Sequence, residues 1–170
     1  MEHPSLERVE TPAMLIVGIP VCATWKELWT QMPAAWRKFW SRRTEIRDPT
    51  GSVLDVSLLE QDGHYVQLVG AAVAALPDGV AVPEGMVAVS IPSHEAWQAD
   101  HHGPLEAIAD SFGAIYAGAQ AAGHPAASFK LDAGYTEDGS ETRHRLSIAT
   151  GPVAWELVAG DAALVGLPAS

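Results

Sequence analysis

Two short stretches far apart in the chain resemble each other and carry the charged residues best placed to do chemistry. Residues 53–56 read VLDV and residues 130–133 read KLDA, and an acidic turn ending in glycine follows each stretch. Asp55 and Asp132 occupy equivalent positions, and Lys130 lies two residues before Asp132. Two carboxylates and one ammonium group could bind a charged compound. A carboxylate pair with different proton affinities could also act as acid and base.

Strand alternation places these three charged residues on one face of a sheet, because successive side chains of a strand point to opposite faces. The other residues of these strands lie on the opposite face and are Leu54, Val56, Leu58, Phe129, Leu131, Ala133 and Tyr135. We expect the apolar sets to pack on helices, and Asp55, Lys130 and Asp132 to line a groove. Lys130 would neutralise part of its negative charge, because a buried lysine without a partner loses its proton. The alternative is a solvated sheet face with no ligand.

Aromatic residues are the second group that could bind a ligand. Four of the six tryptophans recur at helical spacing, at positions 25, 29, 36 and 40. This spacing is typical of core packing, but the same side chains could form a groove wall that stacks on flat ligands or holds a cation. The candidate ligand-binding residues, besides the three charged ones, are Trp29, Trp36, Trp40, Tyr65, Trp97, Phe112 and Tyr116.

Histidine and cysteine give little support to metal or nucleophilic chemistry. His101 and His102 are neighbours, so on a strand they point to opposite faces, and His102 is better placed at the start of a helix near Gly103. The one cysteine, Cys22, has no partner for an internal disulfide, and no nucleophile-elbow or phosphate-loop motif occurs. We therefore expect no metal, no cofactor and no assigned catalytic residue, in a chain of the reducing cytoplasm.

The elements that must position these residues follow a repeated order of strand, helix, strand and strand. The expected strands are Ala13–Pro20, Val53–Leu59, Tyr65–Ala74, Met86–Ile91, Glu95–His101, Ser128–Tyr135 and Arg143–Thr150. One helix begins at the capping pair Thr24 and Glu27, where Pro33 either kinks it or starts another, and a second helix begins at Gly103. Residues 154–158 form either a short strand or a helix. The repeated order predicts a duplicated βαββ unit of α+β class with a mainly antiparallel sheet and two main helices.

The composition is that of a folded protein with an acidic surface. The 170 residues are 48% hydrophobic, which excludes disorder as the main state, and no apolar run is long enough to cross a bilayer. The net charge of −11 comes almost wholly from residues 51–170, which hold three Lys or Arg and fifteen Asp or Glu. Phosphate binding needs clustered cations, so we expect neither a nucleic-acid nor a membrane partner. A monomer and a homodimer both stay open.

The chain resembles the GyrI-like small-molecule-binding domain, the effector-binding module of some AraC- and MerR-type regulators. The resemblance covers about residues 9–150 and depends most on Trp97–Tyr116, where histidines, a Gly-Pro pair and a helix ending near a tyrosine follow one another. Further matching pieces are Val9–Gly18, Ala35–Ile46, and Leu76–Ile91 with its Pro83–Met86.

This resemblance implies a single domain over residues 1–170. It would consist of two pseudo-symmetric SHS2-like halves, about 9–75 and 84–150, with a ligand groove between them and a C-terminal extension over 151–170. No helix-turn-helix is expected before residue 9, so the chain looks like the standalone form.

The resemblance also implies what the groove binds. Such domains often accept flat, apolar, cationic compounds, and some standalone members are hydrolases of cyclopropane-bearing drugs. The family usually has Phe-Glu-x-Tyr after its second helix, where this chain reads FKLD over residues 129–132. Lys130 then stands at the glutamate position, and a two-residue shift would place Asp132 there instead. We expect a multidrug-type protein that sequesters or senses an amphipathic compound, with cations among the candidates. The alternatives are a hydrolase and a protein-interaction module that inhibits a larger enzyme.

Overall fold

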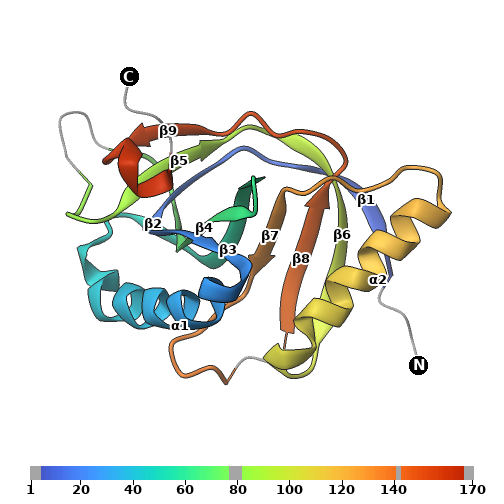
Figure 1. Cartoon of the computed structure of the whole chain (residues 1–170), viewed down its shortest axis with the longest axis horizontal. Coiled ribbons are helices and arrows are strands. Elements are labelled where there is room, and N and C mark those ends of the chain that lie inside the picture. The colour runs from blue at the N-terminus through green and yellow to red at the C-terminus, as the bar shows by residue number, and fades with distance from the viewer. Residues whose placement is uncertain (1–4, 77–81, 141–142, 167–170) are drawn as a thin grey trace.

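Both helices of the chain lie on one face of a long curved sheet (Figure 1). The computed structural model describes residues 5–76, 82–140 and 143–166. Its strands are β1 (Glu7–Thr11), β2 (Met14–Thr24), β3 (Pro49–Gln61), β4 (His64–Val73), β5 (Val87–Ile91), β6 (His94–His102), β7 (Lys130–Ala133), β8 (Arg143–Ala149) and β9 (Glu156–Ala159). Its α-helices are α1 (Trp25–Arg42) and α2 (Ile108–Ala121).

The strands pair in the order β1-β6-β8-β7-β3-β4-β2-β5-β9, and every pairing is antiparallel. In the middle of the sheet, β7 pairs with β3. This pairing joins the strands β6, β8 and β7 of the second half of the chain to the strands β3, β4 and β2 of the first half. Pairing of β1 with β6 and of β5 with β2 ties each half to the other. The predicted α+β class, with two main helices and a mainly antiparallel sheet, is confirmed.

Helix α1 begins at the predicted capping pair. The Thr24 hydroxyl accepts a hydrogen bond from the Glu27 N–H at 3.4 Å, and the Glu27 carboxylate accepts one from the Thr24 N–H at 2.8 Å. These bonds satisfy two of the donors that a helix start leaves free. The helix then runs through Pro33 as one element, so Pro33 does not start a second helix. Its inner face packs on β2 and β4 through Leu28, Met32, Ala35 and Phe39.

Helix α2 is anchored by His101, whereas the sequence favoured His102. The His101 side chain is buried, its Nε2–H donates to the Pro104 carbonyl at 2.9 Å, and the Ser111 hydroxyl lies 2.7 Å from its Nδ1. His102 is the exposed last residue of β6, and the helical turns begin only at Leu105, so its expected place at the helix start is wrong. A 3₁₀ turn (Leu105–Ala107) leads into α2, whose inner face covers Trp97, Ala99, Leu146 and Ile148.

The apolar side chains of β3 and β7 pack on the face opposite to the helices, so the expectation that they pack on the helices is wrong. Leu54, Val56, Leu58, Phe129 and Leu131 lie in a core with residues of β2, β4 and β5. The segment after β8 covers this core with Trp155, Leu157, Leu164 and Val165. The Trp155 indole N–H donates to the Leu58 carbonyl at 3.1 Å. A second apolar cover therefore exists, and the charged side chains of β3 and β7 are left on the helix-bearing face.

Two short strands lie near the ends of the described chain. The first strand, β1, was not predicted, and residues 156–159 form a strand, β9, which decides the alternative left open for that segment. Among the described residues, no helix has both the length and the apolar character needed to cross a membrane.

Candidate functional site between the two helices

Five polar side chains lie on the helix-bearing face, on the strands between α1 and α2. They are Asp55 and Ser57 of β3, Gln67 of β4, and Lys130 and Asp132 of β7, and we call them the central polar strip. In the sheet register, Asp55 pairs with Asp132, and Ser57 pairs with Lys130 on one side and Gln67 on the other. The structure thus brings together the three charged residues that alternation assigned to one face.

Asp132 is buried and held by two neighbours. The Tyr135 hydroxyl donates to its Oδ2 at 2.6 Å, and His144 Nδ1 lies 2.6 Å from its Oδ1. Tyr135 itself packs between the rings of Trp36 and His144, at centroid distances of 4.3 and 4.6 Å. Its expected place on the face opposite to Asp132 is wrong, because β7 ends at Ala133 and strand alternation does not extend to Tyr135. Hydrogen bonds to a charged carboxylate are among the strong ones in proteins, so both Asp132 oxygens are committed to the fold.

Asp55 is recessed between the helices but keeps part of its surface accessible. Burial and the facing Asp132 carboxylate raise the pKa of Asp55 to about 7, against a smaller opposite effect of Lys130. With the Gln67 amide in the orientation that satisfies its hydrogen bonds, its NH₂ group donates to Asp55 Oδ1 at 3.2 Å. A carboxyl group in this position exchanges its proton near neutral pH, which is what a general acid or base needs.

Lys130 extends from β7 toward α2. Its ammonium group lies 5.4 Å from the ring centroid of Phe112 and 5.7 Å from that of Tyr116, which is within cation–π range. Burial lowers the pKa of Lys130, and the charges of Glu60 and Asp55 oppose that shift. Within the described part of the chain, Lys130 makes no hydrogen bond, and no carboxylate oxygen lies within 4.0 Å of its ammonium.

Glu60 is a site residue that the sequence analysis missed. Simple alternation from Asp55 puts residue 60 on the far face, but the pairing shifts between Ser57 and Leu59, so a bulge turns Glu60 to the helix-bearing face. There Glu60 pairs with Tyr65 across the strands and, by hydrogen bonding, raises the pKa of that phenol. Burial and the Glu60 charge also raise the pKa of Tyr116. Glu60 therefore affects the phenols of both Tyr65 on β4 and Tyr116 on α2.

The aromatic candidates lie at different depths. Phe112 and Tyr116 are half-buried beside Lys130, and the Tyr116 hydroxyl donates to the Ala127 carbonyl at 3.0 Å. Trp29 is 73% exposed, and its neighbour Trp25, 61% exposed, contacts Tyr65 at 5.8 Å between ring centroids. The predicted tryptophan stripe is therefore not mainly a core stripe at its first turns.

At the other end of α1, two tryptophans are half-buried. Trp36 packs on Tyr135, and Trp40 stacks on Trp36 at a centroid distance of 6.0 Å and carries the Arg43 guanidinium over its ring. These two residues pack at the Tyr135 end of the central polar strip, whereas Trp29 is exposed to solvent.

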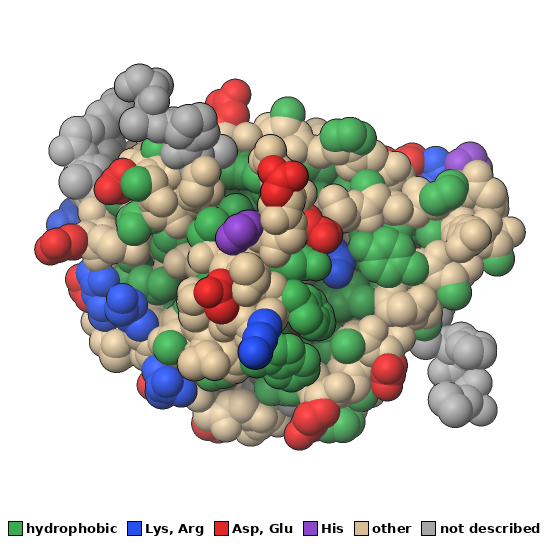
Figure 2. Space-filling view, in the orientation of Figure 1, with side chains coloured by type: hydrophobic (Ala, Val, Ile, Leu, Met, Phe, Trp, Pro, Cys, Tyr) green, Lys and Arg blue, Asp and Glu red, His purple; other side chains and the backbone are tan. Residues whose placement is uncertain are grey.

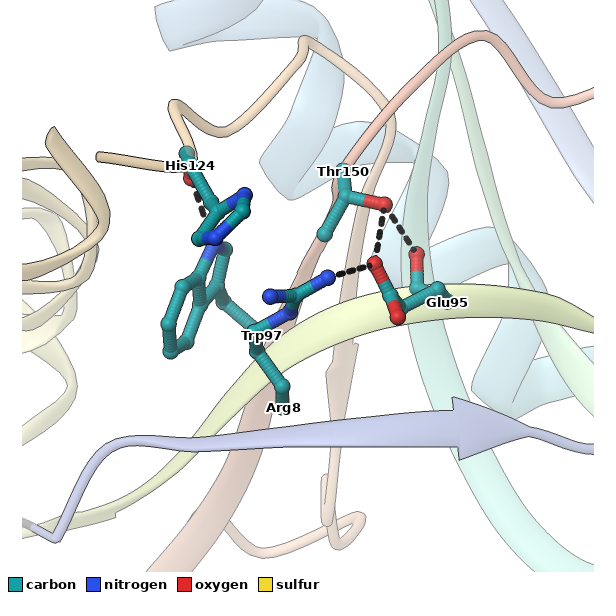
Figure 3. Close-up of polar contacts among 5 residues, drawn as sticks. All are labelled: Arg8, Glu95, Trp97, His124 and Thr150. Carbon is teal, nitrogen blue, oxygen red and sulfur yellow. Dashed lines mark hydrogen bonds and ion pairs between the residues drawn. The ribbon is translucent and has the colours of Figure 1, made fainter. Parts of the chain in front are cut away.

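Trp97 lies deeper than the other aromatic candidates, in the core cluster against which Phe112 and Tyr116 pack. It is 6% exposed beneath α2, and its indole N–H donates to the His124 carbonyl at 2.8 Å (Figure 3). Arg8 lies over the Trp97 ring at 5.6 Å and pairs with Glu95 at 2.7 Å, while the Thr150 hydroxyl bonds to the same glutamate (Figure 3). The expected groove position of Trp97 is corrected to a core position, because the indole fills the gap between β6 and α2.

The surface between the centre of the molecule and α2 is hollowed. Figure 2 shows this hollow lined by hydrophobic side chains, with a basic and an acidic side chain at its edge. A separate open cavity of about 500 Å³ lies beyond the other end of the strip from Lys130, where Val53, Tyr135 and His144 meet. Among the described residues, no three His, Cys, Asp or Glu side chains are grouped to hold a metal ion. The arrangement is suited to an organic compound with an apolar body and a polar group.

Comparison with known proteins agrees with this geometry. A family model described as integron-associated effector binding protein (Cass2) matches residues 7–143. No curated protein sequence matches the chain significantly.

Solved structures share the fold at low sequence identity. An integron cassette protein from the mobile metagenome of Vibrio cholerae, VCH_CASS2, is 15% identical, with a TM-score of 0.63 over 85% of this chain and 94% of that one. SAV2435, solved bound to tetraphenylphosphonium, is 10% identical, with a TM-score of 0.65 over 85% of this chain and 93% of that one. A hydrolase from Listeria innocua is 14% identical, with a TM-score of 0.50 over 91% of this chain and 94% of that one.

Proposed function

The chain belongs to the family of integron-associated effector-binding proteins, in agreement with the GyrI-like resemblance, and on this premise we propose that it binds a flat amphipathic organic compound between α1 and α2. The compound would lie over the central polar strip, and the protein would sequester or sense it. One observation carries the proposal: Asp55 and Lys130 are recessed charged groups on neighbouring strands, and the half-buried rings of Phe112 and Tyr116 lie beside Lys130.

Physical chemistry supports this use of the hollow. Small-molecule sites are concave and mainly apolar, with a few polar groups that orient the ligand. Phe112 and Tyr116 offer aromatic surface on the α2 side, and Trp29 offers it from α1. The drug-bound structure of SAV2435, which has the same fold, is a further support for a small organic ligand.

Intrinsic tryptophan fluorescence tests the proposal. We expect saturable quenching by flat aromatic compounds, and a loss of affinity of about tenfold in Phe112→Ala, which removes ring surface beside Lys130. Val158→Ala is the matched control, because Val158 is a 46% exposed apolar residue on β9, outside the helix-bearing site. Equal affinities of Phe112→Ala and the control for every compound would contradict the proposal.

A hydrolase of a reactive drug-like compound is the second candidate. It is favoured by Asp55, a recessed carboxyl group whose pKa is raised to about 7 and which could give or take a proton. The hydrolase from Listeria innocua, which has a similar fold, also supports this candidate. Product formation that is lost in Asp55→Asn while binding persists would support the enzyme. Saturable binding without product would support the binding protein.

A further inference from the structure

We propose that Lys130 sets the charge class of the ligand, so that the hollow selects flat aromatic compounds with an acidic group and disfavours lipophilic cations. This inference rests on the proposed function, because it concerns the compound held in the same hollow. It concerns which charge that compound carries.

The position of the Lys130 ammonium is the first reason. It lies 5.4 and 5.7 Å from the ring centroids of Phe112 and Tyr116, where these rings attract a cation. The protein's own cation therefore already occupies the aromatic site that a lipophilic cation would use. An incoming cation must displace Lys130 or bind next to it against charge repulsion.

The second reason is that the Lys130 ammonium has no hydrogen-bond acceptor from the protein within the described residues. An ammonium group carries three donors, and here they are left to solvent or to a ligand. Lys130 is also partly withdrawn from water, and burial lowers its pKa, so its charge is solvated less fully than that of an exposed lysine. A ligand carboxylate, sulfonate or phenolate would supply an acceptor and a counter-charge together.

The neighbouring carboxylates do not offset this preference. Asp132 is engaged by Tyr135 and His144, so both of its oxygens already have hydrogen-bond partners within the fold and are not free to bind a ligand. Asp55 takes up a proton near neutral pH and offers a ligand cation less than a full negative charge. Glu60 is exposed and screened by solvent. Lys130 is the recessed charge of the strip that lacks a close counter-ion within the described residues.

Two ions of nearly equal size and opposite charge provide the test. The full chain is first loaded with neutral N-phenyl-1-naphthylamine, which reports on the hollow. Tetraphenylborate or tetraphenylphosphonium is then titrated in, and displacement of the reporter and tryptophan fluorescence are both followed. We expect tetraphenylborate to displace the reporter with at least about tenfold higher affinity than tetraphenylphosphonium. In Lys130→Met, which keeps the apolar chain, we expect this preference to disappear or reverse.

Lys38→Met is the matched control, because Lys38 is an exposed lysine on α1 and its loss changes the net charge equally. It should keep the preference of the unmodified protein. Lys130→Gln is the second variant if Lys130→Met melts early. Equal or tighter binding of the cation by the unmodified protein, or an unchanged ratio in both Lys130 variants, would overturn the inference. Binding of the neutral reporter would then still stand for the proposed function, whereas no binding of any probe would reject both.

Discussion

Asp55 and Asp132 lie directly opposite each other on β3 and β7, yet the fold treats them differently. Asp132 receives 2.6 Å contacts from Tyr135 and His144, whereas Asp55 has, among the described residues, only the Gln67 amide, at 3.2 Å. Two equivalent aspartates have thus become one structural residue and one recessed group that titrates near neutrality. Pairs of carboxylates separated in this way by their surroundings can take different roles.

Asp55 makes the stability of the protein depend on pH. Its pKa is raised to about 7 in the folded chain, so its stabilising contribution is complete below pH 4 and is lost as the pH rises through 7. We expect Asp55→Asn to gain on the order of 1 kcal/mol over the unmodified protein at pH 8, after allowance for its partial exposure, and little at pH 4. Urea unfolding at the two pH values measures this difference. Glu156→Gln, which changes an exposed carboxylate on β9, is the control. An equal gain in stability in both variants would contradict the role of Asp55.

Asp132 and Asp55 should separate in a binding experiment. Asp132→Asn places an amide against groups that donate to both oxygens, so we expect a loss of about 1–3 kcal/mol in the free energy of unfolding. Because those oxygens are committed, ligand affinity should change by less than about twofold. Titration of the folded variant with the neutral naphthylamine checks this. A large loss of affinity without loss of stability would show that Asp132 contacts the ligand and is not only a structural residue.

Tyr135 links α1 to the strip through its ring and its hydroxyl. Removal of the hydroxyl in Tyr135→Phe leaves a buried carboxylate with one partner fewer, so we expect a loss of about 1.5–3 kcal/mol. Tyr65→Phe, whose hydroxyl faces exposed Glu60, should lose less stability than Tyr135→Phe, because solvent screens this contact. Chemical denaturation of the two variants compares them directly, and equal losses would argue against a structural Tyr135–Asp132 bond.

Trp97 and Trp29 should respond oppositely to truncation. Trp97 is 6% exposed and Trp29 is 73% exposed. Trp97→Ala should therefore cost about 3–5 kcal/mol of stability, and Trp29→Ala less than about 0.5 kcal/mol. Trp29→Ala should instead weaken binding of flat compounds, because the exposed indole is available to stack on them. Thermal melts and naphthylamine titrations of the pair measure both effects, and unchanged affinity in Trp29→Ala would remove this residue from the site.

Several features of the fold could be predicted from local sequence alone. The Thr24 and Glu27 spacing predicted the start of α1, and the antiparallel strand pairs around glycine turns follow from short-range chemistry. Period-two alternation also placed Asp55, Lys130 and Asp132 on one face, because that period belongs to any strand. These properties depend on residues close in the chain, which a single sequence displays directly.

The choice of face and the partners of each charge were decided by the tertiary structure. Alternation cannot tell which of two sheet faces a helix covers, and here the C-terminal segment around Trp155 supplies a second apolar cover. A bulge between Ser57 and Leu59 inverts the alternation and brings Glu60 to the site, since one extra residue exchanges the two faces. The sequence by itself determined the class of the protein and its set of charged residues. Long-range packing decided that Asp132 became structural and that Lys130 lies beside aromatic rings without a close counter-ion in the described part of the chain, because burial and hydrogen-bond partners come from segments far apart in the chain.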